Sequence, residues 1–168
     1  MIDQLKLQKD FDDTFTQLEQ VISKFDNENF NLVPFEGSWT AGMDVQHVIL
    51  ASKGTAHEIA AEGITAERNP EQFVERFREI FLDMDKKMKS PAFIDPENKN
   101  YEKKELLTNI AKIHSEVIGQ ITKVDLSEIC TSFEMPGFGH LSRFELVSFV
   151  IFHTKRHTMQ LENILAKL

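Results

Sequence analysis

Five stretches of this chain carry apolar residues three and four positions apart, and this spacing constrains the fold more than any other feature of the sequence. Residues at that spacing lie on one face of an α-helix, and an apolar face has to be buried against another element. The spacing predicts helices over residues 3–27, 40–61, 69–88, 102–124 and 142–168. Strand signals are nearly absent, apart from a short extended piece at 130–133. The sequence therefore predicts an all-α fold, a bundle of four principal helices with an additional short helix or irregular segment.

Three of these predicted helices begin at recognisable caps. Thr40 is placed to cap the second helix, and Asn69 to cap the third with Pro70 in its first turn, where the missing N–H of proline costs nothing. Ser142 and Glu145 have the spacing of a capping box, in which each side chain bonds the backbone N–H of the other residue. These signals predict where the second, third and last helices start.

Composition and charge limit the class of protein. The chain has 168 residues, 41% of them hydrophobic, which is enough for one domain, 1–168, with its own core. The formal net charge of −8 argues against nucleic acid or an anionic membrane as the main partner, because phosphate binding needs positive charge. No signal peptide is visible, and no apolar run approaches the roughly 20 residues that span a bilayer. The single cysteine, Cys130, excludes an intrachain disulfide and predicts a cytoplasmic location.

The last predicted helix carries two histidines on the face that should be apolar. Steps of four and three residues along this face lead through Leu146, Val150, His153, His157, Gln160 and Ile164. Two imidazoles four residues apart share one side of a helix, so both can reach a single metal ion at about 2 Å. In the alternative interpretation each ring bonds an ordinary polar neighbour, and the spacing of His153 and His157 does not decide between the two.

A metal site on this face would need a third ligand from another helix. His47 lies on the second predicted helix, whereas His57 stands among acidic residues and is expected to be solvated. His114 borders the apolar face of the fourth helix, and His140 precedes the cap of the last one. Spacing alone does not choose among these four.

The segments GSWTAGMDVQHVIL and FHTKRHTMQL resemble the DinB/YfiT family of bacterial helical bundles. In that family a Trp-Ser/Thr pair precedes the second helix, a histidine follows eight residues after the tryptophan, and the last helix carries His-x-x-x-His with a glutamine three residues on. The matching residues here are Trp39, Thr40, His47, His153, His157 and Gln160. The resemblance covers essentially the whole chain. It departs at the capping acid, where Met43 stands and Asp44 follows, a difference expected to affect capping and leave the ligands alone.

The resemblance implies a mononuclear metal site with His47, His153 and His157 as ligands, in a protein that forms a homodimer. Three neutral imidazoles leave open positions on a divalent ion, as in catalytic rather than structural sites. Ligation by nitrogen alone favours zinc, nickel or iron over calcium or magnesium. Family members with an assigned activity are thiol-dependent transferases and isomerases. The resemblance thus implies an enzyme in which the metal activates bacillithiol, mycothiol or glutathione for S-transfer to a small electrophile.

Two other functions stay open. One is a metal-dependent hydrolase in which a metal-activated water replaces the thiol. It would need a general base, and no carboxylate near the histidines is expected to point inward, since Glu145 is assigned to a cap and Glu162 lies off the histidine face. That expectation favours the thiol. The other function is a module that binds a metal or a ligand without catalysis.

Four further side chains have both a structural and a functional interpretation. Gln160 would orient a ligand or bound water beside His157, or else bond a neighbouring helix. Trp39 would line the mouth of the site or anchor the start of its helix. Arg156 is expected on the solvated surface, because it points about 100° around the helix from His157. Cys130 is expected to be a small buried side chain rather than a nucleophile, since no histidine is placed locally to activate it.

Overall fold

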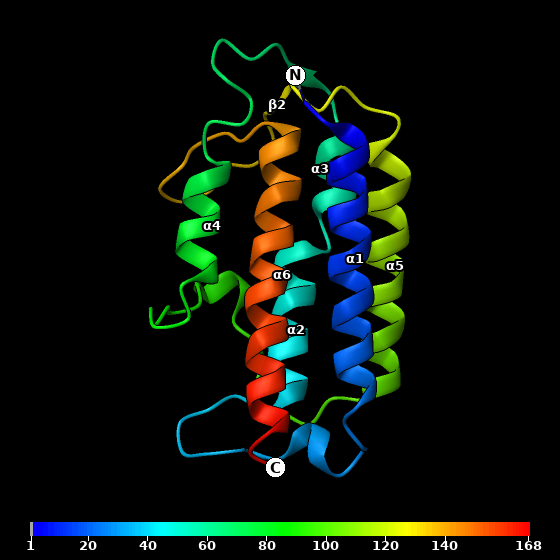
Figure 1. Cartoon of the computed structure of the whole chain (residues 1–168), viewed down its shortest axis with the longest axis vertical. Helices are drawn as coiled ribbons and strands as arrows, with labels where there is room; N and C mark the ends of the chain where they lie inside the picture. The colour runs from blue at the N-terminus through cyan, green and yellow to red at the C-terminus, as the bar shows by residue number, and fades with distance from the viewer. Residues whose placement is uncertain (1) are drawn as a thin grey trace.

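The computed structural model describes residues 2–168, and its regular secondary structure is almost entirely helical (Figure 1). Its α-helices are α1 (Gln4–Ser23), α2 (Ala41–Ser52), α3 (Thr55–Ala60), α4 (Val74–Leu82), α5 (Lys103–Ile121) and α6 (Arg143–Leu165). The connections contain two 3₁₀ helices and two strands, namely η1 (Asn29–Asn31), η2 (Ala92–Ile94), β1 (Gly63–Ile64) and β2 (Ile129–Cys130). None of the described helices combines the length and the apolar character that a membrane span requires.

Four columns of helix stand side by side along the long axis of the molecule: α1, α5, α6 and the successive helices α2 and α3 (Figure 1). Both α5 and α6 contact α1 on one side and α2 and α3 on the other. Outside this bundle, α4 lies against α6. The predicted fold, a four-helix bundle with an additional short helix, is confirmed.

The apolar faces predicted from residue spacing form the core. Helices α1 and α5 each bury one face and leave the other in solvent, as expected for outer helices of a bundle. The largest side chains that are completely buried include Phe11, Phe15, Phe25, Phe30 and Phe77. Helix α6 differs, because neighbours cover it on several sides and its buried residues include serine, threonine, arginine and histidine. The histidines singled out in the sequence therefore lie on an enclosed helix.

The predicted helix 40–61 is two helices, so that expectation is wrong in one respect. The run breaks at Gly54, which is the N-cap of α3. Glycine inside a helix costs about 1 kcal/mol relative to alanine, so it weakens the run at this point. The caps predicted at Thr40 and at the Ser142–Glu145 box are both confirmed.

The third helix, predicted over 69–88, is shorter at both ends. At its start, the Phe73 N–H bonds the carboxylate of Glu145 on α6 at 3.0 Å instead of a carbonyl one turn earlier. At its end, Arg156 on α6 donates to the Phe81 carbonyl at 3.2 Å, which a further turn of helix would have used. Hydrogen bonds from α6 thus set the length of α4, and sequence spacing does not reveal them.

The extended piece predicted at 130–133 is also shorter than expected. Only two residues form β2, and they pair antiparallel with β1, with Gly63 opposite Cys130. A Cβ atom on Gly63 would lie 2.9 Å from the side chain of Glu128, the residue before β2, so the close approach of β1 to this part of the chain favours glycine there.

Candidate metal centre

Three histidines from two helices meet inside the bundle. His47 comes from α2, and His153 and His157 come from successive turns of α6. All three are buried, with at most 6% of each residue exposed. Their ring centroids are 4.5–5.0 Å apart, and one nitrogen of each ring lies within 4.8 Å of the others. The structure therefore brings together the three residues that the sequence singled out.

In two of the rings a hydrogen bond at Nδ1 leaves Nε2 as the nitrogen with the lone pair. Nδ1 of His47 lies 2.8 Å from the Ile94 carbonyl oxygen; a carbonyl only accepts, so this ring carries its proton on Nδ1 and a lone pair on Nε2. Nδ1 of His157 in the same way contacts the carboxylate of Asp44, which leaves Nε2 as the lone-pair nitrogen. Nε2 of His47 faces Nε2 of His153 at 3.0 Å. Metal-binding histidines generally have such an acceptor behind the ring.

Burial keeps two of these rings neutral. Desolvation, followed by the proximity of His157, lowers the pKa of His47 to about 4. Desolvation and then the neighbouring histidines lower the pKa of His153 well below its ordinary value. Since a metal ion binds only the neutral imidazole, no proton has to be displaced from either ring at neutral pH. The donor set therefore fits a divalent ion that accepts nitrogen ligands.

Asp44 corrects two expectations from the sequence. Its side chain is only 2% exposed and its carboxylate contacts His157, so a carboxylate does point inward, and Asp44 does more than affect capping. A carboxylate behind a ligand histidine fixes the ring and raises its basicity. The signal that could have revealed it is spacing, because Asp44 and His47 are three residues apart on α2 and share a face.

The three histidines line a cleft of about 1360 Å³. Its lining includes six phenylalanines, namely Phe35, Phe81, Phe93, Phe133, Phe138 and Phe149. Trp39 and Gln160 also line it, and both are half-buried. The Trp39 ring centroid lies 5.1 Å from that of His47, so Trp39 stands at the site as one of its two interpretations expected. The role of Gln160 stays a prediction.

Arg156 is buried, which contradicts the expectation of a solvated side chain. Its guanidinium donates to the carbonyl oxygens of Phe81 at 3.2 Å and Asp83 at 2.8 Å, and to that of Lys86. The side chain is buried because α4 packs against α6, and because the end of α4 and the segment after it supply the carbonyl oxygens that its guanidinium contacts.

The remaining candidates lie elsewhere. His57 is exposed, as expected. His114 bonds two carboxylates of α1 at 2.9 and 3.2 Å, and His140 bonds a backbone carbonyl of its own loop at 3.0 Å. Cys130 is buried, as expected, and burial raises the pKa of its thiol to about 11. That thiol is therefore protonated near neutral pH and is a poor nucleophile.

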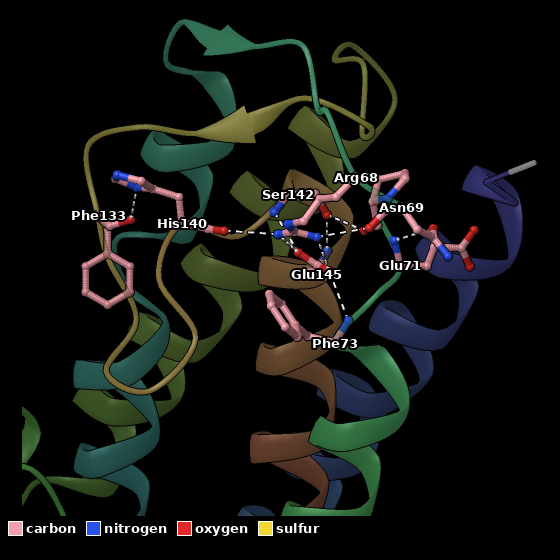
Figure 2. A network of polar contacts seen from close by, with 9 residues as sticks. Arg68, Asn69, Glu71, Phe73, Phe133, His140, Ser142 and Glu145 are labelled. Atoms are coloured by element: carbon pink, nitrogen blue, oxygen red, sulfur yellow. Dashed lines mark hydrogen bonds and ion pairs between the residues drawn. The ribbon is translucent and has the colours of Figure 1, made fainter.

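A second polar cluster, formed by Arg68, Phe73, Ser142 and Glu145, lies near the start of α6 (Figure 2). One oxygen of Glu145 accepts from Arg68 Nη1 at 2.8 Å and from the Phe73 N–H at 3.0 Å. The other accepts from Arg68 Nη2 at 2.6 Å and from the Ser142 N–H at 2.9 Å. This Glu145 cluster joins the chain before α4 to the first turn of α6, and both carboxylate oxygens are fully used.

Comparison with known proteins gives a family and a fold. The family model described as the DinB superfamily matches residues 10–161. The crystal structure of TT2238, a four-helix bundle protein, is similar with a TM-score of 0.60 at 17% sequence identity, covering 96% of this chain and 99% of that one. At this identity the likeness shows the fold alone. No curated protein matches the chain.

Proposed function

We propose that this chain, which belongs to the DinB superfamily, is a metal-dependent enzyme that transfers a low-molecular-weight thiol to a small electrophile. The observation that carries the proposal is the convergence of three buried histidines, His47, His153 and His157, in the lining of a large cleft. A divalent ion held by three imidazoles has open positions and stabilises a thiol there in its nucleophilic, deprotonated form.

The residues around the histidines would hold the three donor nitrogens in place. The Ile94 carbonyl fixes the proton of His47 on Nδ1, and Asp44 does the same for His157, so that each ring offers Nε2. The rings of Phe81 and Phe149 lie with their centroids 5.6 and 5.4 Å from that of His153 and exclude water from that side. In such surroundings a thiolate is less hydrated and reacts more readily.

The lining of the cleft suits both substrates of a thiol transfer. Its phenylalanine and methionine side chains offer an apolar surface to the electrophile. Lys53, Lys87 and Lys89 line the same cleft. Their positive charge complements the carboxylates that glutathione and bacillithiol carry at neutral pH.

A hydrolase is the second candidate function. From the sequence no carboxylate was expected to serve as a general base, whereas in the structure Asp95 is part of the cleft lining. This residue follows Ile94, lines the cleft, and its charge raises the pKa of His47 against the larger effect of burial. A carboxylate placed there is a candidate general base. Asp44, by contrast, is committed to His157 and is not placed to take a proton from a substrate.

Metal titration tests whether the centre exists. Calorimetry of chelator-treated protein with zinc or nickel is expected to give one ion per chain. His153→Ala is expected to abolish this binding, whereas His57→Ala, which removes an exposed histidine, should leave it unchanged. Equal binding by wild type and His153→Ala would refute the proposed centre.

Turnover assays then separate the two reactions. Metal-loaded protein is incubated with monochlorobimane and glutathione, bacillithiol or mycothiol, and metal-dependent fluorescence is expected with at least one thiol. Metal-dependent cleavage of esters or amides without any thiol would support the hydrolase instead, and Asp95→Asn should then abolish it. Metal binding without either activity would leave a binding module.

A further inference from the structure

One loop of the chain is bonded to both metal-binding helices. We call residues 83–94, which run from the end of α4 through η2, the covering segment. Near its start, two of its carbonyl oxygens accept hydrogen bonds from Arg156 on α6, one at 2.8 Å. At its end, the Ile94 carbonyl accepts from Nδ1 of His47 on α2 at 2.8 Å. One anchor is thus a candidate metal ligand, and the other adjoins the candidate ligand His157.

Arg156 is suited to this anchoring, and it also lines the cleft. Its side chain is only 5% exposed, and its hydrogen bonds to oxygen all go to backbone carbonyls at the end of α4 and in the covering segment. A planar guanidinium with five donors can bond several carbonyls at once, which the compact ammonium group of lysine cannot reproduce. Since burying a charge is costly unless its donors are satisfied, the path of the covering segment and the orientation of Arg156 fix each other.

The covering segment also shapes the cleft. Its apolar side chains Met84, Met88, Phe93 and Ile94 line the cleft beside the histidines. Three of them are large and exposed, with 41% of Met84, 48% of Met88 and 64% of Phe93 accessible to solvent. An apolar substrate in the cleft would cover such surface, so the position of the segment helps to set which substrates fit.

We infer that Arg156 is a positioning residue for the metal centre. By holding the covering segment it places the Ile94 carbonyl that orients His47, and it places the apolar side chains that face the substrate. The inference rests on the proposed function for the presence of a metal ion. Its consequence is that loss of Arg156 changes metal affinity and ligand geometry, although Arg156 is not itself a ligand.

Hydrogen exchange of the metal-free protein tests the anchoring by itself. In Arg156→Gln the amides of residues 83–94 are expected to exchange faster than in wild type, while those of α1 and α5 stay protected. Lys155→Gln is the matched control, because Lys155 is the preceding residue and its ammonium lies 5.9 Å from the Phe152 ring on the same helix. Unchanged exchange in Arg156→Gln would overturn the inference at its first step.

Metal affinity and a spectrum test the positioning. Competition with a chromophoric chelator is expected to show zinc bound about tenfold more weakly by Arg156→Gln, the low end of the loss seen when residues behind metal ligands are removed. The visible absorption of the cobalt-substituted protein reports ligand geometry, and its bands are expected to shift in Arg156→Gln. Arg156→Lys should fall between Arg156→Gln and wild type, and Lys155→Gln should match wild type.

The outcomes separate this inference from the proposed function. If wild type binds zinc and cobalt, and Arg156→Gln binds them equally well with an unshifted spectrum, Arg156 is a structural anchor only and the inference is overturned alone. If wild type binds neither ion, the proposed function fails and the inference fails with it. If circular dichroism shows that Arg156→Gln does not fold, Arg156→Lys is used as the test variant. Zinc binding by Arg156→Lys at wild-type strength would then overturn the inference.

Discussion

Helix α6 carries two buried polar clusters, and they differ in how their polar atoms are hydrogen-bonded. In the Glu145 cluster the carboxylate accepts four hydrogen bonds, two from Arg68 and two from backbone N–H groups. In the histidine cluster the outer nitrogens of His47 and His157 are bonded, while their inner nitrogens keep lone pairs directed to a common point. Burial of polar groups does not by itself mark a candidate site. In the histidine cluster the partner of Nε2 of His47 is Nε2 of His153, another candidate ligand, so the contact stays within the set of converging rings.

This difference predicts that the two clusters respond oppositely to mutation. Mutation of the Glu145 cluster should lower the free energy of unfolding and leave metal affinity unchanged. Mutation of the histidine cluster should lower metal affinity and change the free energy of unfolding only modestly. Four experiments test this difference, in order of decreasing expected effect.

The largest effect is expected from removing a candidate ligand. His47→Ala should weaken zinc binding about 1000-fold, because the roughly 10–16 kcal/mol of a typical protein zinc site is shared among a few ligands. Its metal-free form should lose only about 1 kcal/mol of unfolding free energy. Chelator competition and urea unfolding measure the two quantities. Zinc affinity within a few-fold of wild type would show that His47 is not a ligand.

The second largest effect is expected from a mutation in the Glu145 cluster. Glu145→Ala leaves Arg68 and two backbone N–H groups without their acceptor, so the free energy of unfolding should fall by about 3 kcal/mol. Glu162→Ala, at an exposed position of the same helix, is the control and should change stability little. The folded fraction of Glu145→Ala should still bind zinc as wild type does. A large loss of affinity in that fraction would mean that the two clusters are coupled.

A smaller effect is expected from the carboxylate behind His157. Asp44→Asn should weaken zinc binding about 10–100-fold, as other losses of a carboxylate partner behind a ligand do. Asp95→Asn is the control, because it removes one negative charge from the cleft lining without removing a hydrogen bond to a histidine ring. It should weaken zinc binding less than Asp44→Asn does. Equal losses in the two variants would assign the effect to general electrostatics rather than to orientation of the ring.

The smallest effect is a pH dependence of the metal-free protein. The folded pKa of His47 is about 4, below the value near 6.5 in the unfolded chain, so between these values the unfolded state binds more protons. Stability should therefore be unaffected by this group above pH 6.5 and fall as the pH drops from 6.5 toward 4. Urea unfolding of chelator-treated protein should show a shallower decline in His47→Gln. Identical slopes would contradict the assignment.

Local patterns were sufficient to predict much of the fold and to single out two of the three clustered histidines. The apolar spacing of α1 and α5 places these helices within a few residues of their observed ends, because each has one buried and one solvated face. The Ser142–Glu145 box depends on residues three apart and is equally readable. The spacing of His153 and His157 singled out two of the three clustered histidines, and the family resemblance supplied His47.

What the sequence did not reveal depends on contacts between distant segments. Arg156 was expected in solvent because polar residues off the apolar face usually are, but α6 has a further buried side under α4. Its partners are backbone carbonyls, which every residue has, so no residue type in the sequence identifies them. The spacing of Asp44 and His47 places both on one face of α2, but the partner of Asp44 is a histidine 113 positions away, which the local pattern does not identify. The early end of α4 depends on Arg156, which is also distant from α4 in the sequence.

The distance along the chain between His47 and His153, 106 positions, has a consequence for the cell. An ion bound by both would close a long loop that does not exist in the unfolded chain, so binding free energy adds directly to folding free energy. The folded fraction, and with it resistance to proteases, would then track the free metal concentration. Metal starvation would lower the abundance of this protein as well as its activity.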